Sequence, residues 1–180
     1  MSFASPISPF DPAGEDWWSK GSSGLARQLC NASLFLRHFH MHLRFGELSR
    51  APLRLLQFQI QDDAAECDWV ARQQDPWDAA LAPEIGRRHA SLQALKDAID
   101  IRALLFASLP QVDVARLRIH RESLWHSREV IIAGSVRRRD STYRSVHSIA
   151  MRAKLIGFRF SMEDGMLCRL NREELHAAAE

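Results

Sequence analysis

One stretch of the chain decides the fold class: residues 129–157 read EVIIAGSVRRRDSTYRSVHSIAMRAKLIG. Its first nine residues are mostly apolar between Glu129 and Arg137 and predict a strand. Either Asp140 or Ser141 can cap a following helix. Apolar residues then recur at helical spacing, at Tyr143, Val146, Ile149, Ala150, Ala153 and Ile156. Gly157 stands where this helix is expected to stop, so the stretch predicts a strand followed by an amphipathic helix.

The neighbouring segments extend this pattern in both directions. Upstream, Ser91 can cap a helix that runs to Ser108, and a strand is expected over residues 114–120. Downstream, residues 158–162 and 166–170 flank Asp164-Gly165, a dipeptide favoured in tight hairpin turns. Residues 91–170 therefore predict the order α-β-β-α-β-β. Two helices that bury their apolar sides on one face of a small mixed sheet give an α+β fold.

The segment Val130-Ile131-Ile132-Ala133-Gly134-Ser135-Val136, placed before the second helix, resembles the BON domain family. Members of that family carry a similar strand with a glycine before its final valine, then a helix and a closing strand. The resemblance covers residues 91–170. It implies a non-catalytic module associated with phospholipid surfaces, secretin-type pores or envelope proteins. The expected absence of a secretory signal departs from that envelope setting.

The N-terminal part predicts a β-hairpin. In residues 33–45, apolar residues alternate with polar ones at a period of two, which is typical of a strand with one buried face: Phe39, Met41, Leu43 and Phe45. The alternation returns at Leu56, Phe58 and Ile60 after a short polar loop. We expect a short helix over residues 62–70, which Asp62 and Asp63 would start, and a loop over residues 73–86.

The domain organisation follows from these segments. Residues 1–24 are rich in Pro, Gly and Ser and predict a flexible N-terminal arm. Residues 25–175 then form a single α+β domain, in which residues 25–90 supply the hairpin and a helical segment. The tail over residues 171–180 is expected to be a short helix.

Composition excludes several classes of protein. The chain has 180 residues, of which 46% are hydrophobic and 26% charged, both ordinary for one globular domain. No apolar run is long enough to predict a transmembrane segment, and the N-terminus does not predict a secretory signal. Three widely spaced thiols, Cys30, Cys67 and Cys168, form no CxxC pair, which argues against a disulfide framework and favours the cytoplasm.

Charge is unevenly distributed and indicates a binding surface. Residues 113–160 hold 11 Lys and Arg against 4 Asp and Glu, whereas residues 1–112 hold 11 against 13. Most of these cations are arginines, which bind carboxylate or phosphate with paired hydrogen bonds. We expect an anion-binding or partner-binding face at the start of the second helix, formed by Arg137, Arg138, Arg139, Arg144, His147 and Arg152. The alternative is a solvated arginine face that pairs with acids of the N-terminal half.

A histidine array is the second candidate site. On a strand, His38, His40 and His42 would project from one face, and two of them could ligate zinc or another divalent metal. A further ligand would have to come from Glu47 or from the acids of residues 62–68. The alternative is that the three histidines form the solvent-facing side of the strand.

Catalytic motifs are absent from the sequence. There is no GxSxG, no glycine-rich phosphate loop and no CxxC. Cys67 lies between Glu66 and Asp68, which would raise its pKa, the wrong direction for a nucleophile. We therefore predict a non-enzymatic binding or assembly module that presents arginines to an acidic protein, a nucleic acid or an anionic lipid headgroup. A metal-dependent enzyme that uses the histidines, and an RNA- or DNA-binding protein, are the alternatives.

Overall fold

The computed structural model describes residues 16–75, 77, 80–122 and 127–177. Its helices and strands confirm the α+β class. The helices are α1 Asp16–His42, α2 Pro83–Ser108, α3 Ile149–Ile156 and α4 Arg172–Ala177. The strands are β1 Arg54–Gln61, β2 Ala64–Val70, β3 Val114–Glu122, β4 Arg128–Arg137, β5 Phe158–Arg159, β6 Met162–Glu163 and β7 Met166–Leu167.

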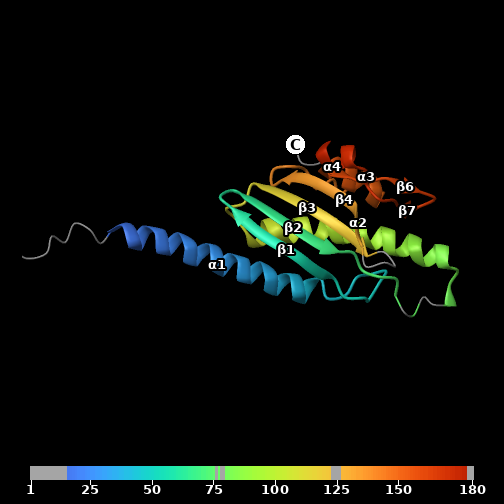
Figure 1. Ribbon diagram of the computed structural model, residues 1–180, viewed down its shortest axis with the longest axis horizontal. Coiled ribbons are helices and arrows are strands. Elements are labelled where there is room, and N and C mark those ends of the chain that lie inside the picture. The colour runs from blue at the N-terminus through green and yellow to red at the C-terminus, as the bar shows by residue number, and fades with distance from the viewer. Residues whose placement is uncertain (1–15, 76, 78–79, 123–126, 178–180) are drawn as a thin grey trace, which may run out of the picture.

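A mixed sheet with the order β1-β2-β3-β4-β5 organises the fold. Strands β2 and β3 are parallel, because α2 connects them, and the other neighbouring pairs are antiparallel. Figure 1 shows α2 running behind the sheet and the N-terminal part of α1 extending away from it. Helices α1 and α3 both pack against α2. The face of the sheet that these helices cover is called the covered face below, and the other is the open face.

The core lies between the covered face and the helices. Phe35 and Phe39 of α1, Trp69 of β2 and Ile119 of β3 are fully or almost fully buried in one continuous cluster. The rings of Phe35 and Phe58 are stacked with 4.6 Å between their centroids, which packs α1 against β1. One core therefore joins residues from α1 to β7.

The predicted strand over residues 33–45 is wrong, because these residues belong to α1 up to His42. Burial follows a spacing of four, at Phe35, Phe39 and Leu43, whereas Met41 and Phe45 are 65% and 60% exposed. A spacing of four places side chains on one side of a helix. The alternation of apolar and polar residues in this segment therefore does not reflect a strand. Residues 16–24, expected in the arm, also lie in α1, and residues 1–15 lie outside the described residues.

The hairpin exists but uses a different partner strand. Strand β1, predicted over residues 56–61, pairs with β2, where a helix was expected and is not found. Ala65, Cys67 and Trp69 of β2 are buried on the covered face, so its apolar residues have the period of a strand. The acids expected to start a helix instead lie in the turn, where Asp62 has a φ of 50°.

The helix boundaries also differ from prediction. Helix α2 begins at Pro83 rather than near Ser91, so the expected loop over residues 73–86 is too long; proline suits the first turn of a helix. Helix α3 begins only at Ile149, because Ser148 caps it by accepting a hydrogen bond from the Met151 N–H at 3.3 Å. Residues 141–148, expected to form the first turns of this helix, lie in a loop instead.

Other predictions are confirmed. Strands β3 and β4 lie where they were expected, and Gly157 ends α3 in the left-handed conformation with a φ of 110°. Asp164 and Gly165 form the turn between β6 and β7 with φ values of 49° and 79°. The tail contains the short helix α4.

Candidate functional site: the open face of the sheet

The three histidines of the proposed metal array lie on α1 and do not form a row. His38 and His42 are four residues apart on one side of the helix, with 5.5 Å between ring centroids. His40 lies two residues from each, on another side of α1. Nδ1 of His38 lies 3.4 Å from the Ser108 hydroxyl at the end of α2. Among the described residues, no three His, Cys, Asp or Glu side chains are grouped so that they could hold a metal ion.

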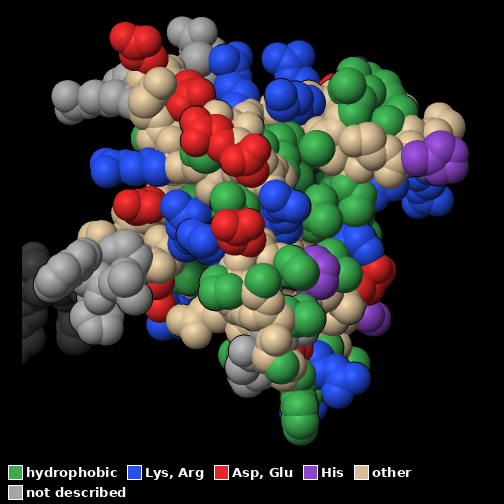
Figure 2. Space-filling view, turned by 90° about the vertical axis from the view of Figure 1, so that its right-hand side faces the viewer, with side chains coloured by type: hydrophobic (Ala, Val, Ile, Leu, Met, Phe, Trp, Pro, Cys, Tyr) green, Lys and Arg blue, Asp and Glu red, His purple; other side chains and the backbone are tan. Residues whose placement is uncertain are grey.

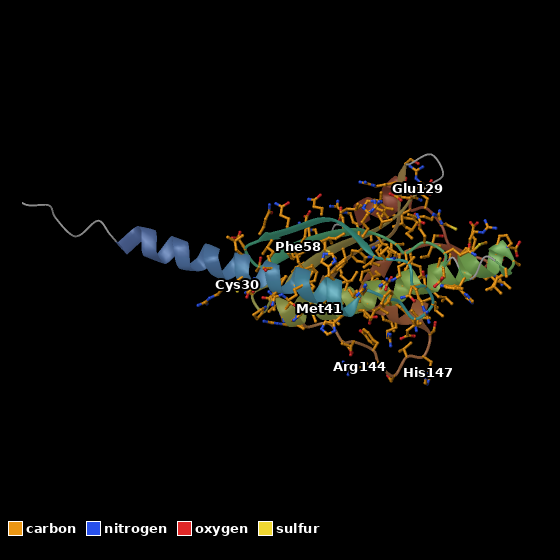
Figure 3. All side chains as sticks on the ribbon, turned by 90° about the horizontal axis from the view of Figure 1, so that it is seen from below. Cys30, Met41, Phe58, Glu129, Arg144 and His147 are labelled. Atoms are coloured by element: carbon orange, nitrogen blue, oxygen red, sulfur yellow. The ribbon has the colours of Figure 1, made fainter. Side chains whose placement is uncertain are left out.

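The predicted anion-binding residues are not brought together on a helix face. Arg137 ends β4, Arg139, Arg144 and His147 are exposed on the loop before α3, and Arg152 is half-buried in α3. Figure 3 shows Arg144 and His147 projecting from this loop at the edge of the molecule. The N-terminus of α3 does not bring these side chains together, because α3 begins at Ile149, after Arg144 and His147.

Arg138 has a structural role. Its guanidinium donates hydrogen bonds to the carbonyl oxygens of Phe106 at 2.7 Å and of Val112 at 2.8 and 2.9 Å, and also to that of Leu109. These carbonyls lie at and just beyond the C-terminal end of α2, where a helix leaves acceptors unpaired. The guanidinium also lies 5.1 Å from the centroid of the Phe106 ring. Arg138 therefore caps α2.

The sheet itself carries a more compact group of charges, on its open face. Arg116, Arg118 and His120 occupy alternate positions of β3 and therefore project to the same side. We call these three residues the β3 row. Leu117 and Ile119 between them, and Ala115 before them, are buried on the covered face. The parallel register places Glu66 beside Arg116 and Asp68 beside Arg118.

Ion pairs connect the β3 row to the acids of β2. Nη1 of Arg116 lies 3.1 Å from a Glu66 oxygen, and Nε of Arg118 donates to Asp68 at 2.8 Å. Nη2 of Arg118 also lies 3.6 Å from Glu66. The side chains of Arg116 and Arg118 are still 51% and 43% exposed. Each guanidinium has five N–H donors, so several donors of both arginines are free to bind another group.

A hollow of about 430 Å³ lies over this part of the open face. The β3 row lines it together with Gln57 of β1, Asp68 of β2 and Leu175 of α4. Leu175 also packs against the small cluster of Ala133 in β4 and Leu170, so α4 covers one side of the open face and leaves β2 and β3 accessible. The volume is within the range of pockets that hold small ligands or a single side chain.

His120 and Asp68 lie deepest in this group. Nε2 of His120 is 3.7 Å from an oxygen of Asp68, too far for a hydrogen bond, so the contact is an ion pair only when the imidazole is protonated. Both ring nitrogens of His120 are buried without a hydrogen-bond partner in the described part of the chain. Burial alone would raise the pKa of Asp68, but its interactions with His120 and Arg118 outweigh burial and lower this pKa below its usual value.

The described lining of the hollow has no hydroxyl, thiol or amine nucleophile. Asp68 and His120 could exchange a proton, but no Ser, Thr, Cys, Lys or Tyr residue lines it. Cys67 faces the core, and burial, with the adjacent charge of Asp68, raises the pKa of its thiol. Around the end that carries the β6–β7 hairpin, the described cations and anions are interspersed (Figure 2) and form no broad surface of one sign there.

The sequence contains one signal for this site. The segment Arg116-Leu117-Arg118-Ile119-His120 alternates cationic and apolar residues within a predicted strand, which places the cations on one face. The contribution of Asp68 could not be predicted in the same way, because residues 62–70 were expected to be helical. The parallel pairing of β2 with β3 brings Asp68 to the row.

The comparisons with known proteins do not assign a function. In the described residues, no helix has the length and apolar character needed to cross a membrane. The similarity of residues 91–170 to the BON domain family remains a prediction. Searches against protein-family models, curated proteins and solved structures find no match to this chain.

Proposed function

We propose that the protein is a non-enzymatic binding module for an anionic partner, and that the β3 row is its principal contact. The observation that supports this proposal is the position of the row: Arg116, Arg118 and His120 line one hollow on an uncovered part of the sheet. The partner would present a carboxylate or a phosphate group to the hollow. Guanidinium groups suit both anions, because their planar N–H donors bind two oxygens at once.

The free donors of the two arginines support an anion as the ligand. Arg116 pairs with Glu66 and Arg118 with Asp68, so two acids match the two positive charges. Anion binding therefore depends on the guanidinium N–H donors that these pairs leave free. Asp68 holds Arg118 through Nε at 2.8 Å, which orients the guanidinium and leaves Nη donors for a ligand. The acid therefore has a positioning role in this proposal.

A polar partner group fits the site better than a stacked base. Residues on the described open face include Gln57, Gln59, Glu66, Asp68 and the β3 row, and none of these is a Phe, Tyr or Trp. Single-stranded nucleic acids are usually bound by stacking bases on such side chains. A carboxylate of an acidic protein or a phosphate of a small molecule needs only the cationic donors.

The test compares two double variants that each remove two positive charges. Arg116→Gln/Arg118→Gln removes the guanidinium groups of the β3 row, and Arg137→Gln/Arg139→Gln removes exposed arginines outside it. Retention on a heparin column and the thermal stabilisation produced by phosphate or citrate measure anion binding. We expect the first variant to bind at least about tenfold more weakly, since hydrogen bonds to charged groups contribute roughly 1.5–3 kcal/mol each.

The control variant decides between the two arginine groups. It should keep the affinity of the parent protein for phosphate and citrate. A loss of binding confined to Arg137→Gln/Arg139→Gln would place the anion site on the loop before α3 instead. Equal, unchanged binding in both variants would contradict the proposed function altogether.

A further inference from the structure

Strand β1 forms one edge of the sheet and has an unpaired side. It is the first strand in the order β1-β2-β3-β4-β5, and within the described residues only β2 pairs with it. Alternate N–H and C=O groups along an edge strand point away from the sheet. Such a row of backbone donors and acceptors can pair with the strand of another chain.

The edge lacks the features that usually prevent such pairing. Residues 55–61 read LLQFQIQ and contain neither a charged residue nor a proline. The whole strand has eight residues, which is long for an edge, and only its first residue, Arg54, is charged. The only irregularity is a register shift between Leu55 and Gln57, at the start of the strand. Residues 57–61 are therefore regular, uncharged and available.

This segment is complementary to a second copy of itself. Gln57, Gln59 and Gln61 are exposed on the open face, while Phe58 and Ile60 pack against the core on the covered face. Consider two copies of β1 that pair in antiparallel fashion about a two-fold axis through one of these residues. Residues that lie opposite each other in the two strands then project to the same face of the joined sheet. Glutamine then meets glutamine across the interface, and apolar residues meet apolar residues. No like charges are brought together.

Helix α1 extends the same side of the molecule with apolar residues. Asn31 donates to Gln111 at 3.2 Å and His38 contacts Ser108, so this side of α1 faces the C-terminal end of α2. Leu29 and Leu36 precede Asn31 and His38 by two positions. They therefore lie about 160° around the helix from those residues, on the side away from α2. Leu29 is exposed and Leu36 is half-buried. Because α1 packs beneath β1, both can contribute apolar area at the edge.

We propose that two copies of this chain associate through the outer edge of β1, in an antiparallel pair that joins their sheets into one. The pairing adds backbone hydrogen bonds between the two β1 strands and places glutamine side chains opposite each other on the open face. Arg116 and Arg118 of the β3 row remain accessible on that face in each copy. This interface does not depend on the proposed anion site.

Charge substitution at the edge tests the pairing. Light scattering after size-exclusion chromatography should give about twice the 20.5 kDa mass of the chain for the parent protein. Gln59→Lys/Gln61→Lys places like charges at the centre of the interface and should shift the protein to the monomer, with at least a tenfold higher dimer dissociation constant. Gln73→Lys/Thr142→Lys adds the same charge at exposed positions elsewhere and should remain dimeric.

A complementary variant separates loss of pairing from loss of folding. Gln59→Glu/Gln61→Glu should also be monomeric alone, and its mixture with the lysine variant should form a mixed dimer. Circular dichroism melts identify any variant that does not fold, and the single change Gln59→Lys then replaces it. A monomeric parent protein, a dimeric lysine variant, or folded variants that fail to pair when mixed would each overturn the proposal.

Discussion

Two arginine–aspartate pairs lie in different surroundings within this fold. Nε of Arg72 lies 3.0 Å from Asp97 between the helices and the end of β2, where the two side chains are only 1% and 2% exposed. Arg118 and Asp68 form a pair of similar length, 2.8 Å, on the open face. Burial raises the pKa of Asp97 to about 6, although Arg72 and Gln93 act to lower it. The pKa of Asp68 is lowered.

The difference shows how solvent access decides the role of an ion pair. Arg72 also donates to the carbonyl oxygens of Ala51 at 2.7 Å and Arg44 at 3.2 Å, and to that of Leu43. These bonds hold the connection between α1 and β1 against α2. Each nitrogen of this guanidinium has a protein acceptor, because removal from water is costly for an unpaired charge. The Arg118 pair keeps contact with solvent, so its remaining donors can bind a ligand.

The largest effect is expected for the buried pair. Arg72→Met would leave Asp97 without its charged partner and would remove the bonds to the connection before β1. We expect a loss of about 3–5 kcal/mol in the free energy of unfolding, measured by urea denaturation. The double variant Arg72→Met/Asp97→Leu should recover part of this loss, since it removes the unpaired buried acid. If Arg72→Met were as stable as the parent protein, the buried pair would have no larger structural role than the pair on the open face.

The two aspartates should also give opposite pH dependence of stability. A raised pKa means that the contribution of Asp97 is complete below about pH 4 and is lost as the pH rises through about 6. The loss is at most about 3 kcal/mol, since one pKa unit corresponds to about 1.4 kcal/mol. The contribution of Asp68 is present above about pH 4 and is lost as the pH falls through its lowered pKa.

Urea denaturation across this pH range measures both dependences. Asp97→Asn should remove the decrease in stability between about pH 4 and 6, and Asp68→Asn should affect only the more acidic range. The same slope in Asp97→Asn and in the parent protein would show that another group titrates there.

An arginine of intermediate exposure should give an intermediate effect. Arg138→Gln removes the hydrogen bonds that cap α2, and each buried acceptor left without a donor costs about 1–3 kcal/mol. Arg139→Gln, at the adjacent exposed position, should change stability by no more than about 0.5 kcal/mol. Thermal melts of the two variants provide the comparison. Equal melting temperatures would mean that the cap contributes little.

The smallest effect on stability is expected on the open face. Arg118→Gln breaks a partly exposed ion pair, which typically contributes only about 0–1 kcal/mol. The same change should clearly weaken binding of phosphate, if the β3 row is the anion site. A destabilisation as large as that of Arg72→Met would instead assign Arg118 a structural role.

Predictions from sequence succeeded where a local pattern had only one interpretation. Strands β3 and β4, the stop at Gly157 and the turn at Asp164-Gly165 were all expected, because each depends on a short run of side chains or on the backbone freedom of particular residues. Residues 33–45 contain a period of two and a spacing of four at once. The pattern alone could not decide between strand and helix there.

The sequence by itself determined the α+β class, the two central strands and the presence of many arginines in the C-terminal half. The tertiary structure alone decided which of these arginines are available. Arg138 caps α2, Arg72 is buried beside Asp97, and Arg116 and Arg118 of the β3 row stay accessible. The physical reason is that an arginine's partners come from residues far along the chain. Those partners and the burial around them exist only after the parallel pairing of β2 with β3 and the packing of α2 have formed.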